Sequence, residues 1–97
     1  MPYKIILTRN AIEKFKRLDA RLRATVRDTL NIHLSHEPTK ESKSRIKRLR
    51  EFRIPQYRLK ADEVRIFYQV TDQEEVVILG IMPKEETIAW LEQHGEK

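Results

Sequence analysis

Three strand-like segments follow one another in the C-terminal half of the chain, and only short connections separate them. They cover residues 56–60, 64–71 and 75–82, with residues 61–63 and 72–74 between them. Connections of that length join strands as hairpins. The third segment reads Val-Val-Ile-Leu-Gly-Ile from residue 76 and is apolar on both faces, which is typical of a central strand. We therefore expect an antiparallel meander with its last strand inside the sheet.

The N-terminal half predicts one more strand and two helices. Residues 3–7 are rich in β-forming residues, and Thr8 is placed to cap a helix over about residues 10–18. A second apolar stripe advances by four residues from Leu22 to Leu34, with Asp19 as its cap and Pro38 as its end. Two helices with almost no loop between them form a helical hairpin.

The remaining segments complete an α+β fold. Residues 39–53 lack a clean period, and a final helix is expected over about residues 84–94, ended by Gly95. The predicted order is β-α-α-β-β-β-α over residues 1–97, a single domain with the first strand and the meander in one sheet.

Composition excludes several classes of site. The chain has no cysteine, so disulfides and thiolate chemistry are excluded, and two glycines leave no room for a glycine-rich phosphate loop. No apolar run approaches the length of a membrane span. We expect a cytoplasmic protein that needs no cofactor, no metal and no membrane.

Positive charge is concentrated in residues 40–60. This segment carries nine lysines and arginines against two glutamates, a net charge of +7, whereas the whole chain has +5. A local excess of this kind predicts a surface for a polyanion, with nucleic acid as the first candidate. The residues expected to contact RNA from this segment are Lys43, Arg45, Lys47, Arg48, Arg50 and Arg53.

Strand alternation sharpens that prediction. Arg58 and Lys60 point to one face of their strand, and Arg65 and Phe67 share a face of the next strand. If the apolar residues face the helices, these three cations converge on the other side with an aromatic ring among them. Such a set suits RNA, with cations for phosphates and a ring for a base. The alternative is a solvated basic face with Phe67 covered by the C-terminal helix.

An ordered set of short motifs runs from the basic segment to the last helix: Leu49-Arg50, Tyr57-Arg58-Leu59-Lys60, Val64-Arg65-Ile66-Phe67-Tyr68, the apolar strand, and Lys84. In this order and over nearly the whole length, the chain resembles the RelE/ParE superfamily of toxins from type II toxin-antitoxin systems. The resemblance implies a four-stranded antiparallel sheet. For RelE-like members it implies an endoribonuclease that cuts mRNA in the ribosomal A site. The implied partners are a cognate acidic antitoxin, the ribosome with its mRNA and, through the antitoxin complex, operator DNA.

The resemblance also places the catalytic residues. It puts Arg58, Lys60, Arg65 and Lys84 at the cationic positions of RelE-like sites, where they would stabilise a pentacoordinate phosphorane. Lys60 is one candidate for the general base, if neighbouring cations lower its pKa. Glu85, or its neighbour Glu86, is the other.

Some residues depart from the family pattern. Trp90 stands where many members have tyrosine or histidine, and an indole stacks on a base but exchanges no proton. The alternative for Trp90 is a core anchor of the last helix. His33 and His36 are spaced for a metal but lack a third ligand, and His94 is better read as a partner of its helix dipole.

Two further functions stay open. A ParE-like toxin has the same fold but inhibits DNA gyrase without hydrolytic chemistry. A degenerate toxin would act only with its antitoxin in operon repression.

Overall fold

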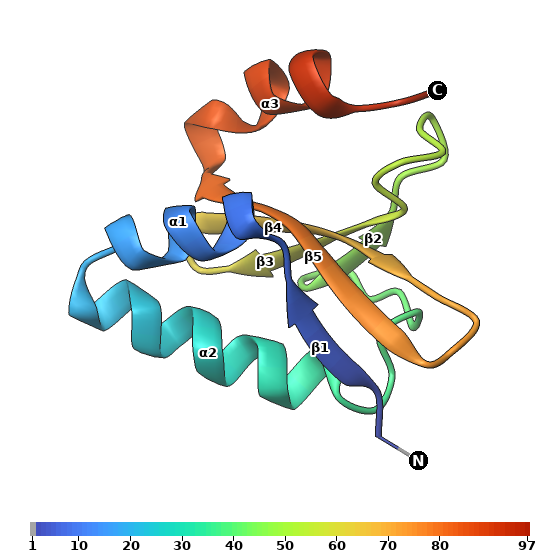
Figure 1. Cartoon of the computed structure of the whole chain (residues 1–97), viewed down its shortest axis with the longest axis horizontal. Helices are drawn as coiled ribbons and strands as arrows, with labels where there is room; N and C mark the ends of the chain where they lie inside the picture. Colours follow the sequence, from blue (N-terminus) through green and yellow to red (C-terminus); the bar gives the residue numbers. More distant parts are fainter. Residues whose placement is uncertain (1) are drawn as a thin grey trace.

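The computed structural model describes residues 2–97, which form one five-stranded mixed sheet and three helices (Figure 1). In chain order the elements are β1 Lys4–Leu7, α1 Arg9–Arg17, α2 Ala20–Leu34, β2 Ile46–Arg48, β3 Tyr57–Ala61, β4 Val64–Val70, β5 Glu75–Pro83, a short 3-10 turn Lys84–Glu86, and α3 Thr87–His94. The strands lie in the order β1-β5-β4-β3-β2. The α+β prediction and the meander β3-β4-β5 are confirmed, and β5 lies inside the sheet.

The sheet differs from the expected four antiparallel strands in two ways. β1 pairs with β5 in parallel, from Lys4 opposite Glu75 to Leu7 opposite Ile78. The short strand β2 adds a fifth member by pairing antiparallel with β3. Three residues are too few to give a readable period, and the direction of an edge strand depends on long-range topology, so neither feature was visible in the sequence.

The two helix starts follow the predicted caps. The Thr8 hydroxyl accepts a hydrogen bond from the backbone N–H of Ala11 at 3.2 Å, and the Asp19 carboxylate accepts one from Leu22 at 2.8 Å. Each cap satisfies an N–H group that the first helical turn leaves without a partner. The helical hairpin therefore begins where the sequence places it.

The main core lies between this hairpin and one face of the sheet. Val26, Leu30 and Leu34 of α2 are buried against residues such as Leu59 and Ile66 from β3 and β4. These strand residues alternate with Arg58, Lys60 and Arg65, which consequently point to the other face. Burial of one face thus fixes the direction of the cations.

The other face of the sheet is partly covered by α3, which lies on the opposite side of the sheet from α2 (Figure 1). No residue of α3 is fully buried. Its principal anchor is Trp90, whose ring stacks on Phe67 with centroids 5.0 Å apart and planes 3° from parallel. Gly80 lies under this stack, and a Cβ there would be 2.7 Å from the indole ring, so only glycine permits the close approach.

Within residues 2–97, no helix is both long enough and apolar enough to cross a membrane.

Candidate functional site

A cationic cleft lies on the α3 side of the sheet, with a volume of about 290 Å³. Its cations come from four elements, and Leu49, Phe67, Thr87 and Leu91 supply the rest of its lining. None of the lining residues is acidic. The cations are Lys47 of β2, Arg58 and Lys60 of β3, Arg65 of β4, and Lys84, which begins the 3-10 turn after β5. The five cations, which the sequence nominates as catalytic or RNA-binding residues, thus lie together in one cleft.

Sheet register brings like charges face to face in this cleft. Lys47 is opposite Arg58 in the β2-β3 pair, and Lys60 is opposite Arg65 in the β3-β4 pair. Directly opposed like charges destabilise a sheet. The arrangement therefore works against the fold of the free protein, and a bound anion would offset that effect.

Arg58 lies at the centre of this crowding. It is half-buried, and its Nε atom is buried with no hydrogen-bond partner among the described residues. Burial lowers the pKa of Arg58, and the charge of Arg65 lowers it further. A partly desolvated guanidinium of this kind is suited to an anionic ligand.

Arg65 is buried and is held by hydrogen bonds to the backbone. It is only 9% exposed, and its Nη1 donates hydrogen bonds to the backbone oxygens of Asp62 at 2.7 Å and Val64 at 3.2 Å. Strand alternation predicts the face of Arg65 but not its burial, which places the side chain in the lining of the cleft. Arg65 is a fixed positive charge within the cleft wall.

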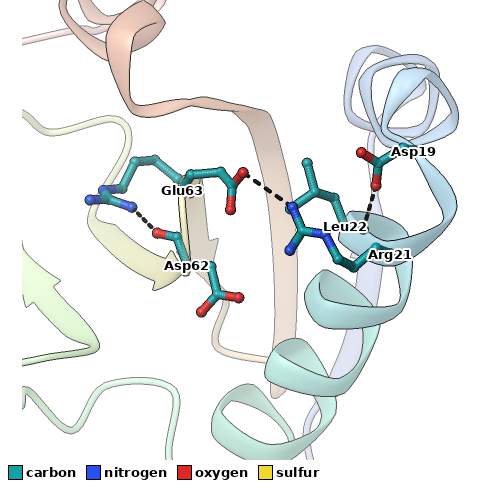
Figure 2. A network of polar contacts seen from close by, with 6 residues as sticks. Asp19, Arg21, Leu22, Asp62 and Glu63 are labelled. Atoms are coloured by element: carbon teal, nitrogen blue, oxygen red, sulfur yellow. Dashed lines mark hydrogen bonds and ion pairs between the residues drawn. The ribbon is translucent and has the colours of Figure 1, made fainter.

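The turn that holds Arg65 is itself tied to α2. Asp62 has a positive φ of 54°, and its neighbour Glu63 forms an ion pair with Arg21 at 3.3 Å. Figure 2 shows this contact between the β3-β4 turn and the first turn of α2, where Asp19 caps the helix. The tether is exposed to solvent, so it contributes little energy of its own but orients the turn.

Lys60 is the lysine whose environment most favours a neutral amine. Its pKa lies below the ordinary lysine value, first because of Arg58, then because of desolvation and the charges of Arg65, Lys84 and Lys47. Positive neighbours disfavour another positive charge. Lys60 is therefore better suited than an isolated lysine to accept a proton.

Most other cations of residues 40–60 lie outside the cleft. Arg45 donates to the backbone oxygen of Lys60, and Arg48 lies 5.1 Å from the centre of the Tyr57 ring on the other side of β2. Arg50 pairs with Glu41 at 3.0 Å, Arg53 pairs with Glu96 at 2.7 Å, and Lys43 is exposed in the segment before β2. Of the six predicted RNA contacts in this segment, only Lys47 lines the cleft, and the other five stay predictions.

The two aromatic predictions turn out differently. Phe67 is 2% exposed and covered by Trp90, so the expectation of a free ring for base stacking was wrong and the covered alternative holds. Trp90 anchors α3, lines a separate hollow between α1 and α3, and has the His94 ring 5.0 Å away on a tilted plane. It does not line the cationic cleft, which leaves its predicted RNA contact without geometric support.

The carboxylates proposed as a base are also outside the cleft. Glu85 and Glu86 are exposed, neither lines the cleft, and Glu86 lines hollows on the α1 side of α3. They lie in the 3-10 turn before α3, which changes their direction from that of a continuous helix. The geometry favours Lys60 over Glu85 as the proton acceptor.

Two of the histidines lie together near the end of α2, away from the cationic cleft. His33 lines a hollow with His36, and its pKa is lowered by burial and then by Arg45. Among residues 2–97, no group of three or more metal-ligating side chains lies close enough to hold an ion.

The apolar walls of the cleft were not predicted. Leu49 follows β2, and Leu91 comes from the side of α3 that faces the cleft. Their role depends on how α3 is placed over the sheet, and no local sequence pattern carries that information.

Comparisons with known proteins agree with this fold. The family model described as ParE toxin of type II toxin-antitoxin system, parDE, matches residues 5–88. The comparison with curated proteins gives no match.

Several solved structures are similar to the chain. The toxin-antitoxin complex RelBE2 of Mycobacterium tuberculosis has a chain with 26% identity and a TM-score of 0.70, covering 87% of this chain and 100% of its own. The RelE-RelB complex of Pyrococcus horikoshii gives 20% identity and a TM-score of 0.70, with 87% and 97% covered. A mutant of Escherichia coli toxin RelE in the free state gives 20% identity and a TM-score of 0.68, with 93% and 92% covered. The family model spans most of the sequence, and the chain belongs to the RelE/ParE family of toxins from type II toxin-antitoxin systems.

Proposed function

We propose that this toxin is a ribosome-dependent endoribonuclease that cuts mRNA and thereby stops translation. The observation that carries the proposal is the cleft itself, where Lys47, Arg58, Lys60, Arg65 and Lys84 surround a hollow with no acidic residue in its lining. A gyrase inhibitor that acts by binding alone does not need a lysine such as Lys60, whose pKa is lowered by neighbouring cations. The structural similarity to RelE chains supports the same reading.

The cleft residues fit RNA cleavage through the 2′-hydroxyl. The 2′-oxygen attacks the adjacent phosphorus while Lys60, in its neutral form, takes the hydroxyl proton. Arg58 and Arg65 stabilise the added negative charge of the phosphorane. The bond from phosphorus to the 5′-oxygen then breaks, and we assign protonation of that oxygen to the ammonium of Lys84. The products are a 2′,3′-cyclic phosphate and a free 5′-hydroxyl.

The proposed partners of the toxin are an acidic antitoxin and, through the complex of the two proteins, operator DNA. An acidic antitoxin would neutralise the cleft by charge complementarity, and the toxin-antitoxin complex would contact operator DNA. RelB-bound relatives support an antitoxin of that class. Since the substrate is mRNA on the ribosome, the toxin would act in the cytoplasm.

The order of events in induced cells tests this function. We expect protein synthesis to stop at once, with primer extension detecting cuts in a reporter mRNA, while a DNA-damage reporter stays silent at first. Lys60→Gln should abolish the cuts. The matched control is Lys16→Gln, which replaces an exposed lysine of α1. This variant should cleave like the wild type. Early DNA damage with intact mRNA would contradict the proposal.

A ParE-like inhibition of DNA gyrase is the second candidate. The matching family model, which describes a ParE toxin, favours it. It predicts the reverse order, with DNA damage preceding the loss of translation. A toxin active only in operon repression would give neither effect.

A further inference from the structure

We infer that the turn between β3 and β4, residues 62–63, positions two cations of the cleft for RNA cleavage. For the reaction that the turn serves, the inference rests on the proposed function. Neither Asp62 nor Glu63 lines the cleft. Their backbone oxygens instead accept hydrogen bonds from Arg65 and Lys84, which do line it. Asp62 and Glu63 are therefore positioning residues, which act on the substrate only through those two cations.

Each carbonyl oxygen of the turn holds one of the two cations. The Asp62 oxygen accepts a hydrogen bond from Nη1 of the Arg65 guanidinium at 2.7 Å. The Glu63 oxygen accepts one from the backbone N–H of Lys84 at 3.0 Å, next to the last β4-β5 pair. The same two-residue turn thus fixes a side chain of β4 and the point where the chain leaves β5. It sets the position of Arg65 relative to Lys84.

The cations need this support because they repel one another. Lys60 is opposite Arg65 in the β3-β4 pair and precedes Asp62 by two residues. The pKa of Lys60 is lowered by Arg58 first and also by Arg65 and Lys84. Like charges at such short range favour any movement that separates them. The carbonyl oxygens of the turn oppose that movement, because each accepts a hydrogen bond from one of the two residues.

The shape of the turn depends on the residue at position 62. Asp62 has a φ of 54°, in the left-handed region that aspartate, asparagine and glycine tolerate and β-branched residues do not. The residue is exposed, so a substitution there alters the backbone without changing the core. On its other side the turn is tied to α2, where Arg21 pairs with Glu63 at 3.3 Å (Figure 2).

The chain supplies a matched control for this turn. Glu74, in the connection between β4 and β5, also has a positive φ, of 60°, and is also exposed. It precedes β5, whereas Lys84 follows β5, so the two turns lie at opposite ends of that strand. Asp62→Val and Glu74→Val therefore impose the same kind of backbone strain, one beside the cleft and one away from it.

Hydrogen exchange on the purified toxin tests the positioning without any substrate. Exchange of the Lys84 backbone N–H, followed by NMR, should be roughly 5- to 30-fold faster in Asp62→Val, the factor that left-handed strain provides. It should keep the wild-type rate in Asp62→Asn and in Glu74→Val. Both valine variants should lower the thermal midpoint by similar amounts.

A milder variant acts on the same turn from α2. Arg21→Gln removes the ion pair to Glu63 and should speed exchange at Lys84 by about 1.5- to 5-fold, as expected for an exposed ion pair. Arg27→Gln, at an exposed position of the same helix, is its control and should exchange like the wild type. Wild-type exchange at Lys84 in both Asp62→Val and Arg21→Gln would overturn the inference.

Cleavage of ribosome-bound mRNA well below the thermal midpoints is the second measurement. At saturating ribosomes, Asp62→Val should lower the rate about 10-fold or more, since misplacement by about 1 Å can cost roughly 10²-fold. Asp62→Asn and Glu74→Val should cleave like the wild type. Equal losses of rate in the two valine variants would reduce the turn to a contribution to stability and overturn the inference. Faster exchange at Lys84 in Asp62→Val, with no cleavage even by the wild type, would refute the proposed function while supporting the turn as the element that holds the two cations.

Discussion

Replacement of Arg65 by alanine should damage both stability and activity. The buried guanidinium donates to the backbone oxygens of Asp62 and Val64, and alanine would leave both without that donor. Hydrogen bonds from a charged donor are worth about 1.5–3 kcal/mol. Against this, removal of a like charge opposite Lys60 returns roughly 0.2–1 kcal/mol. Counting one such contribution for the single Nη1 donor, the net loss should be about 0.5–3 kcal/mol, or roughly 2–22 °C in the thermal midpoint.

Thermal unfolding by circular dichroism measures the first effect, and cleavage of ribosome-bound mRNA well below both midpoints measures the second. The cleavage rate should fall roughly 10²- to 10³-fold, the typical loss on removing one donor to transition-state charge. Arg27→Ala, an exposed cation on α2, is the control and should change neither quantity. An unchanged midpoint for Arg65→Ala would refute the tether to Asp62, and unchanged cleavage would refute its place in the active site.

Three other substitutions test separate parts of the account. Wild-type cleavage should rise with pH as Lys60 loses its proton, at a pH below the ordinary lysine pKa; a wild-type rate that does not change with pH, or cleavage by Lys60→Gln that still rises with pH, rules this base out. Glu85→Gln should cleave like the wild type because Glu85 lies outside the cleft, and a large loss would nominate it as the base instead. Gly80→Ala should cost about 1–3 kcal/mol by forcing a methyl group against the Trp90 ring, and a red shift of tryptophan fluorescence checks that α3 has moved; unchanged emission and stability would contradict the packing.

The sequence predicted the elements that depend on local signals. Thr8 and Asp19 cap the helices as their residue types suggest, and hairpin-length connections identify the meander. Strand alternation correctly placed Arg58, Lys60 and Arg65 on one face. These features follow from spacing along the chain, which a sequence contains.

The features that were missed depend on contacts between distant segments. Alternation gives the face of Arg65 and Phe67 but not how deeply they are buried. Phe67 is covered by Trp90 of α3, and Arg65 is held by the backbone at Asp62 and Val64. β1 lies at the edge of the sheet and pairs in parallel with β5. The direction of this pairing depends on how distant segments of the chain meet. β2 is too short for its pattern to separate Lys47 from Arg48, although they lie on opposite faces. The residues that can act on RNA were therefore predictable from the sequence. Their grouping into one cleft was predictable only in part.

Cleavage in a purified system tests the central claim most directly. Purified toxin is added to ribosomes carrying a defined mRNA, to the same mRNA without ribosomes, and to gyrase with relaxed plasmid. We expect cuts only in the ribosome-bound mRNA, 5′-hydroxyl ends on the downstream fragments, normal supercoiling by gyrase, and no cuts with Lys60→Gln. Intact ribosome-bound mRNA together with inhibited gyrase would contradict this expectation.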